Sequence, residues 1–179
     1  MKSGFVAILG EANVGKSTLL NAILKEKVSI VSPKPQTTRN KILGIYNDED
    51  CQIVFIDTPG IHKEKNKLDE YMSKAISTAR SDVDVIMYVI DGTKKITEHT
   101  IETLNKYTKG ASVILVVNKI DDTNYAKLYP ELTKCNNLEN IKDIVPVSAK
   151  KSKNLDELIK VIKTYLKEDI KYFDDDVYT

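Results

Sequence analysis

The stretch GEANVGKSTLLN, residues 10–21, carries two glycines separated by four residues and followed at once by a lysine and a serine. This spacing, G-x-x-x-x-G-K-[ST], is that of the phosphate-binding loop, in which backbone N–H groups surround phosphate oxygens. Gly10 and Gly15 permit the tight backbone path, and the positive end of the following helix faces the same point. The apolar run FVAIL (5–9) precedes the motif and a helical pattern follows it. We therefore predict a nucleotide phosphate site between a buried strand and a helix.

Two polar side chains of this loop have predicted roles. Lys16 would place its charge beside the β and γ phosphates, and Ser17 would place its hydroxyl on Mg²⁺. The predicted phosphate-binding residues are Gly10, Glu11, Ala12, Asn13, Val14, Gly15, Lys16, Ser17 and Thr18.

Apolar runs alternate with helix-like segments along the chain. The runs are short and β-branched without clean alternation, which is typical of parallel strands buried on both faces. The run 41–47 departs from this rhythm, because the polar turn NDED joins it directly to the next run and predicts an antiparallel hairpin. The predicted strands are 5–9, 41–47, 51–57, 84–91, 112–118 and 143–148, and the predicted helices are 16–25, 68–80, 96–107, 124–134 and 155–167.

Composition limits the class of protein. A chain of 179 residues with 41% hydrophobic content suits one domain with a sizeable core, and a net charge of +1 argues neither for nor against nucleic acid. Two cysteines indicate no disulfide framework. No apolar stretch is long enough for a signal peptide or a membrane span. We therefore expect a cytoplasmic protein.

The motif DTPG, residues 57–60, ends another buried run. Asp57 would hold Mg²⁺ through a water, and the Gly60 N–H would sense a γ-phosphate. We count Asp57, Thr58, Pro59, Gly60 and Ile61 among the nucleotide-binding residues.

The motif NKID, residues 118–121, predicts which base is bound. The Asp121 carboxylate only accepts hydrogen bonds, and guanine offers it two adjacent donors that adenine lacks. Asn118 can bond the purine and tie the loops together, and the stem of Lys119 can lie over the base. An ATP-using enzyme such as a kinase is therefore disfavoured.

The motif SAK, residues 148–150, follows the last predicted strand. The Ala149 N–H can meet guanine O6, and Lys150 can cover the other face of the base. Because each motif follows the carboxyl end of a strand, we expect one nucleotide crevice at one edge of the sheet. The predicted base-binding residues are Asn118, Lys119, Asp121, Ser148, Ala149 and Lys150.

The segment 28–45 has prolines and threonines that interrupt any regular element. A threonine here could bind Mg²⁺ only while a γ-phosphate is present, so the loop would order with the triphosphate and relax after hydrolysis. Thr38 is our choice for this role, and Thr37 is the alternative. A plain surface loop is the competing interpretation.

Taken together, these features predict an α/β fold: a P-loop NTPase with a Ras-like G domain. We expect a six-stranded, mostly parallel sheet with one antiparallel strand and helices on both faces. The chain resembles the G domain of the Era family of bacterial ribosome-assembly GTPases over nearly its whole length. The matching motifs are NVGKSTLLN, SIVSPKPQTTR, ILGIY, QIVFIDTPGIH, NKID and VSAK.

The resemblance implies Mg²⁺-dependent GTP hydrolysis and a switch that acts in small (30S) subunit assembly and 16S rRNA maturation. It also implies peripheral membrane association, although this chain shows no anchor for it. We expect a monomer. An alternative is a GTP-dependent binding module with negligible hydrolysis of its own, activated by a ribosomal or RNA partner.

Two departures from the family pattern stand out. Glu11 and Ala12 replace the usual Arg-Pro pair, and nothing after Asp169 resembles the family's RNA-binding KH domain. We expect residues 1–170 to form the G domain and 171–179 to begin a linker to a KH domain that a truncated chain lacks. RNA binding by this chain itself is then not expected.

The catalytic group is less clear than the binding residues. Ile61 stands where many GTPases have a glutamine that orients water, and His62, Arg39 and Arg80 are weak substitutes. The resemblance implies that Asn13 helps to bind K⁺ beside the phosphates, and a plain P-loop contact is the alternative. The predicted catalytic residues are Lys16, Thr38, Gly60 and Asn13, and the predicted metal ligands are Ser17, Thr38 and Asp57.

Overall fold

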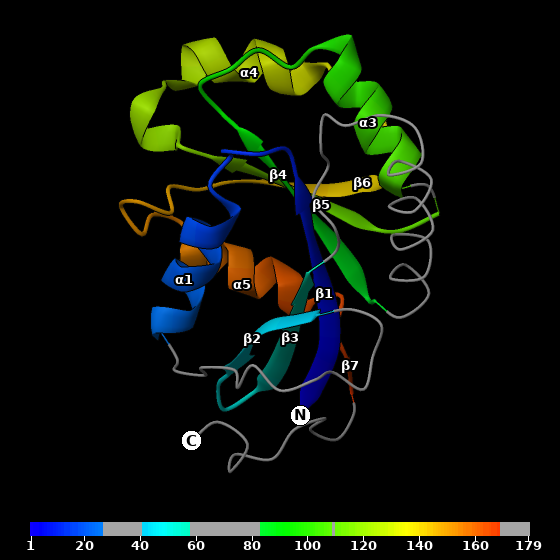
Figure 1. Ribbon diagram of the computed structural model, residues 1–179, viewed down its shortest axis with the longest axis vertical. Coiled ribbons are helices and arrows are strands. Elements are labelled where there is room, and N and C mark those ends of the chain that lie inside the picture. The colour runs from blue at the N-terminus through cyan, green and yellow to red at the C-terminus, as the bar shows by residue number, and fades with distance from the viewer. Residues whose placement is uncertain (27–40, 58–82, 109, 169–179) are drawn as a thin grey trace.

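A sheet of seven strands runs through the middle of the molecule (Figure 1). The computed structural model describes residues 1–26, 41–57, 83–108 and 110–168. Its strands are β1 (Lys2–Gly10), β2 (Lys41–Asn47), β3 (Cys51–Asp57), β4 (Val85–Asp91), β5 (Val113–Asn118), β6 (Ile141–Pro146) and β7 (Lys167–Glu168). Its helices are α1 (Lys16–Glu26), α3 (Glu98–Thr108), α4 (Tyr125–Thr133), α5 (Leu155–Lys163) and the short 3₁₀ helix η1 (Ile120–Asp122).

The strand order is β2-β3-β1-β4-β5-β6, with β7 paired to β1 outside this path. All pairs from β3 to β6 are parallel, and β2 pairs with β3 in the antiparallel direction. The predicted α/β fold with one antiparallel hairpin is therefore confirmed. The described structure adds β7, a second antiparallel strand of two residues, to the six that we predicted.

Helices cover both faces of the sheet, as predicted. Buried residues of α1 and α5 pack with one set of strand side chains, including Val6 and Ile8 of β1. Buried residues of α3 and α4 pack with the other set, including Ala7 and Leu9. Successive side chains of a strand point to opposite faces, so each central strand contributes to both cores. This explains why the central runs are apolar throughout.

The C-terminal part of the chain differs from the prediction. The helical spacing predicted a helix over 155–167, whereas α5 ends at Lys163. The next residues make a turn, and β7 then pairs with the start of β1 at Lys2 and Ser3. Leu166 stays buried beside the sheet without being helical. Pairing with β1 supplies the backbone hydrogen bonds that further helical turns would have supplied.

Two boundaries also move. The last parallel strand spans 141–146 instead of 143–148, and Ser148 makes only an isolated bridge with Lys153. Asn154 holds the N-cap position of α5, but its backbone is left-handed and its side chain does not cap the helix. Its amide donates instead to the Pro146 carbonyl at 2.7 Å.

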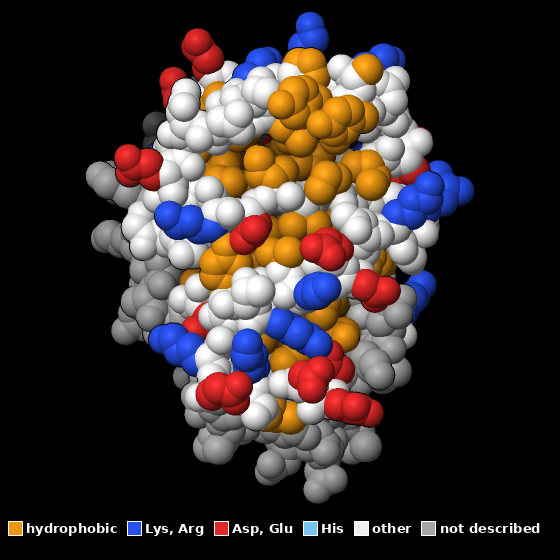
Figure 2. Space-filling view, turned by 180° about the vertical axis from the view of Figure 1, so that it is seen from behind, with side chains coloured by type: hydrophobic (Ala, Val, Ile, Leu, Met, Phe, Trp, Pro, Cys, Tyr) orange, Lys and Arg blue, Asp and Glu red, His pale blue; other side chains and the backbone are white. Residues whose placement is uncertain are grey.

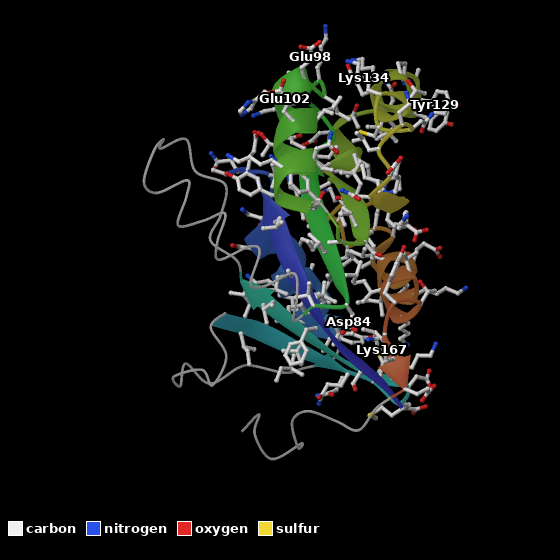
Figure 3. All side chains as sticks on the ribbon, turned by 90° about the vertical axis from the view of Figure 1, so that its right-hand side faces the viewer. Asp84, Glu98, Glu102, Tyr129, Lys134 and Lys167 are labelled. Carbon is white, nitrogen blue, oxygen red and sulfur yellow. The ribbon has the colours of Figure 1, made fainter. Side chains whose placement is uncertain are left out.

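Phe5 of β1 makes two hydrogen bonds with Asp84 at the end of the sheet where Asp84 and Lys167 lie near one another (Figure 3). The Phe5 N–H donates to the Asp84 carboxylate at 2.9 Å, and the Asp84 N–H donates to the Phe5 carbonyl at 2.9 Å. These two bonds extend the pairing of β1 with β4 beyond its first parallel pair, Val6 with Val85.

The described part of the surface carries an exposed aromatic pair. Tyr125 and Tyr129 of α4 are 72% and 53% exposed, with ring centroids 5.3 Å apart. On the face seen in Figure 2, hydrophobic side chains gather in the upper part and charged side chains of both signs lie scattered below. Within the described ranges, no helix is long and apolar enough to cross a membrane.

Candidate nucleotide-binding site

The carboxyl ends of the parallel strands bring the predicted motifs to one edge of the sheet. In the parallel registers Gly10 lies opposite Val89, Ile8 opposite Asp57, and Asp91 opposite Asn118. The P-loop and the loops after β3, β4, β5 and β6 therefore start side by side. This is where ligands bind in open α/β sheets.

The P-loop turns sharply, and its glycines are required by contacts as well as by conformation. Gly10, Asn13 and Gly15 have φ angles of 152°, 67° and 94°. A Cβ at Gly10 would lie 2.5 Å from the Val89 carbonyl oxygen, and one at Gly15 would overlap the amide nitrogen of Asn118. Only glycine fits both positions.

The start of α1 presents donors to the interior of this loop. The Lys16 ammonium donates to the Gly10 carbonyl at 2.5 Å and so lies across the loop. The Leu19 N–H donates to the Gly15 carbonyl at 2.9 Å, which begins the helix. The first turn of α1 holds no acidic residue, and Ser17 and Thr18 are exposed there. A phosphate would meet a positive helix end and a lysine.

Asn118 joins two loops through its buried side chain. Its Nδ2 donates to the Val14 carbonyl at 2.9 Å, and its Oδ1 accepts from the Ala149 N–H at 3.0 Å. Asn118 is 2% exposed. The sequence predicted that Asn118 ties the loops together, and these two bonds show how it does so.

Lys119 makes a second link, between the end of β5 and the P-loop. Its Nζ donates to the Asn13 carbonyl and to the Asp91 carboxylate, each at 3.0 Å. Its backbone is left-handed, with a φ of 68°. The ammonium is thus directed to protein oxygens, while the predicted contact of its stem with the base stays a prediction.

Asp121 is the middle residue of η1 and is oriented by a serine. The Ser148 hydroxyl donates to Asp121 Oδ1 at 2.7 Å and accepts from the Lys151 N–H at 3.1 Å. The bond from Ser148 holds the pKa of Asp121 below its ordinary value, with help from the charges of Lys150 and Lys151. Asp121 is therefore a carboxylate at neutral pH, able to accept two hydrogen bonds from one partner.

The geometry at Ala149 differs from the expected one. We predicted that its N–H meets guanine O6, but this N–H donates to Asn118 Oδ1 and Ala149 is buried. The buried Asn118 oxygen needs a donor, and Ala149 supplies it. In this arrangement a contact with O6 requires another donor or a change of partner at Ala149. Lys150, predicted to cover the base, is exposed beside it.

Several predicted residues lie outside the described residues. The backbone of Asp57 ends β3 at the expected edge, but its side chain is not among those described. The described residues also leave out all of residues 28–40 and the helix predicted over 68–80. The other predictions outside the described part concern Thr37, Thr38, Arg39, Thr58, Pro59, Gly60, Ile61, His62 and Arg80.

Two residues near the site were not predicted. Asp91 binds Lys119, and the only sequence signal was its place at the end of an apolar run, before Gly92. Tyr88 lines a cavity of about 210 Å³ between the P-loop and the start of α3, and Glu11 also lines it. Its hydroxyl is buried and has no hydrogen-bond partner in the described structure. Burial, and then the negative charge of Glu11, raise the pKa of Tyr88.

A glycine loop between a buried strand and a helix, and a fixed carboxylate two loops away, define a P-loop nucleotide-binding domain with a purine-reading loop. Residues 5–119 match the model of the family described as 50S ribosome-binding GTPase. The chain belongs to this family.

The chain is also similar to two curated relatives, as the resemblance to Era predicted. It is 52% identical over 182 residues to GTPase Era of Clostridioides difficile strain 630 and 46% identical over 180 residues to GTPase Era of Clostridium tetani. Each match covers 99% of this chain and 61% of the relative. The chain thus spans less than two thirds of the length of these relatives.

Solved structures give the same result. An Era variant of Aquifex aeolicus bound to GDP and AlF4⁻ is 40% identical, and Era in complex with MgGDPNP and a fragment of 16S ribosomal RNA is 41% identical. Both have a TM-score of 0.78, and each match covers 98% of this chain and 61% of that chain. The G domain of the Methanococcus jannaschii FeoB protein is more distant, at 25% identity and a TM-score of 0.66.

Proposed function

We propose that this chain is a guanine-nucleotide switch that binds GTP, hydrolyses it to GDP and phosphate, and acts in small-subunit assembly and 16S rRNA maturation. The GTPase family match supports the reaction. The family description names the 50S ribosome. The Era protein that was solved with a 16S rRNA fragment is 41% identical to this chain. We give the 16S rRNA complex more weight, because it concerns an individual protein similar to this chain, whereas the 50S description covers a whole family. A cytoplasmic location follows from this proposal.

The observation that carries the proposal is the fixed carboxylate of Asp121. Ser148 holds one of its oxygens at 2.7 Å, and Asn118 braces the two loops on which Asp121 and Ser148 stand. A carboxylate with a lowered pKa pairs with the two donors of a guanine edge and would lie unpaired beside adenine.

The proposed cation sites use residues around the P-loop. Ser17, Thr38 and Asp57 would hold Mg²⁺, which would supply positive charge to the β and γ phosphate oxygens. Ser17 fits this role, because it is exposed in the first turn of α1 next to Lys16. Asn13 would hold K⁺ through its side-chain oxygen, since its carbonyl oxygen already accepts from Lys119.

A competition assay tests the base preference. We expect GDP to displace a fluorescent guanine nucleotide from the chain, and a hundredfold excess of ADP to leave it bound. Asp121→Asn should weaken GDP binding by about a hundredfold or more. The same variant should bind xanthosine diphosphate better than GDP, because the new amide can donate to the 2-oxo group.

The matched control is Asp122→Asn, which makes the same chemical change at the neighbouring exposed residue. Its affinity for GDP should stay within about twofold of the unchanged chain. Equal displacement by GDP and ADP would refute the proposed guanine specificity.

A further inference from the structure

Asp91 is a nearly buried carboxylate at the end of β4. Its side chain is 6% exposed. A buried charge is costly unless it is paired and hydrogen-bonded. Oδ1 accepts from the Thr93 N–H at 2.9 Å and the Thr93 hydroxyl at 2.6 Å, and Oδ2 accepts from the Lys119 ammonium at 3.0 Å. Both oxygens therefore have partners, and one partner, Lys119, comes from the loop after β5 that also carries Asp121.

Lys119 passes this contact on to the P-loop. The same ammonium donates to the Asn13 carbonyl at 3.0 Å. Lys119 and Asn13 have φ angles of 68° and 67°, in the left-handed region that is unfavourable for residues other than glycine. Such conformations persist only where surrounding contacts hold them. The contacts from Asp91 through Lys119 to Asn13 join three loops and connect two of these disfavoured backbones.

We propose that Asp91 is a positioning residue for nucleotide binding: it orients the Lys119 ammonium so that the P-loop at Asn13 keeps the shape that receives the phosphates. This inference rests on the proposed guanine-nucleotide site. Without the carboxylate, the ammonium loses its counter-charge. The ammonium would then leave the Asn13 carbonyl and be hydrated by solvent.

The competing explanation is that Asp91 only shapes the turn after β4 through Thr93. The two explanations differ in which partner matters. If Lys119 is the partner that matters, loss of Asp91 and loss of the Lys119 ammonium should affect binding through one shared interaction. If Thr93 is, the two losses should be independent.

The test is a double-mutant cycle on GDP affinity, measured with the whole chain. Asp91→Asn keeps an oxygen that can accept from Thr93 and removes the charge. We expect its Kd for GDP to rise about tenfold, as for a charge-assisted hydrogen bond that is lost. In a Lys119→Met background, Asp91→Asn should change the Kd by less than about twofold. An unchanged Kd for Asp91→Asn alone, or additive effects in the double variant, would overturn the inference.

Two controls separate the alternatives. Thr93→Val removes one hydroxyl bond to Asp91 and leaves the ion pair with Lys119, so the Kd should stay within about twofold. Glu131→Gln makes the same carboxylate-to-amide change in another ion pair, with Lys134 at 2.6 Å, and should leave the Kd unchanged. A tenfold loss in Thr93→Val would assign the effect to the turn.

A measurement on the unchanged chain covers the case in which Asp91→Asn does not fold. The Lys119 ammonium should give a ¹⁵N side-chain NMR signal whose hydrogens exchange more slowly than those of the exposed Lys94 and Lys95. Equally fast exchange would refute the link from Asp91 to Asn13. This readout needs no nucleotide. If the chain binds no GDP, the proposed function fails while the contact itself is still tested.

Discussion

Asn118 shows how much of this site depends on one side chain. Its amide donates to the P-loop and accepts from the loop after β6, and it also occupies the space that a Cβ at Gly15 would need. Gly15 and Asn118 are far apart in sequence and depend on each other. A change at either residue should alter phosphate and base binding together.

The hydroxyl of Tyr88 is the opposite case, a buried polar group with no hydrogen-bond partner in the described structure. An unsatisfied buried hydroxyl costs about 1–3 kcal/mol. We therefore expect Tyr88→Phe to raise the free energy of unfolding by about 1 kcal/mol, measured as a higher urea midpoint at unchanged slope.

Tyr165→Phe is the matched control for that prediction. The Tyr165 hydroxyl donates to the Asp143 carboxylate at 2.5 Å, so the same change should lower the free energy of unfolding by about 1.5 kcal/mol or more. If Tyr88→Phe were also destabilising, the Tyr88 hydroxyl would have to be bonded to ordered water in the adjacent cavity.

The place of a site residue in the fold can be predicted where one short motif also fixes its position after a strand. Gly10, Lys16 and Asp121 belong to such motifs, and the fold brings these motifs to one edge. Tyr88 could not be predicted, because the sequence does not show that its hydroxyl is buried without a partner. Asp91 could not be predicted, because its partner Lys119 follows a different strand. The partner of the Ala149 N–H was missed for the same reason.

Among the elements, the β2–β3 hairpin and α5 are joined by an ion pair. The Lys163 ammonium lies 2.7 Å from Asp48 Oδ2, and the Asp48 side chain is 12% exposed. Asp48 Oδ1 also accepts from the N–H groups of Asp50 and Cys51, each at 2.8 Å. One carboxylate thus closes the turn of the hairpin and attaches it to the end of a helix on the sheet.

This attachment should make stability depend on pH. Burial alone would raise the pKa of Asp48, but the bonds from Lys163 and the two N–H groups outweigh it and lower the pKa from 3.8 to about 2. The stabilisation is present above pH 4 and is lost as the pH falls towards 2. We expect the unchanged chain to lose about 2 kcal/mol more than Asp48→Asn between pH 4 and pH 2 in urea unfolding.

The comparison with Asp48→Asn is needed because other carboxylates, such as Asp91 and Glu131, also have lowered pKa values. They should contribute equally to both chains. A parallel loss of stability in the two chains would show that Asp48 has no depressed pKa in solution.

Element boundaries show the limit of periodic patterns. The hairpin strands 41–47 and 51–57 could be predicted to the residue because a polar turn separates them. The end of α5 could not, because Leu166 continues the helical spacing although β7 pairs with β1. A buried leucine satisfies both arrangements, and only the tertiary pairing distinguishes them.

At the scale of the whole molecule, the parallel sheet gathers motifs spread from residue 10 to residue 150. Asn118 and Lys119 brace the loops at that edge through their bonds to Val14 and Asn13. In our proposal Lys16 faces the phosphates and Asp121 faces the base. Hydrolysis in our proposal also needs Thr38 and Gly60, which lie outside the described residues. Turnover is therefore a property of several segments acting together.

The last prediction concerns that turnover. If Asn13 holds K⁺ beside the phosphates, the cation should stabilise the developing negative charge as an arginine would. We expect single-turnover GTP hydrolysis with Mg²⁺ to be about tenfold faster in KCl than in NaCl at equal ionic strength. Asn13→Ala should remove this difference, whereas Asn136→Ala, at an exposed residue after α4, should keep it. Equal and slow rates in both salts would refute the K⁺ site. They would instead favour a GTP-dependent binding module whose hydrolysis depends on a ribosomal or RNA partner.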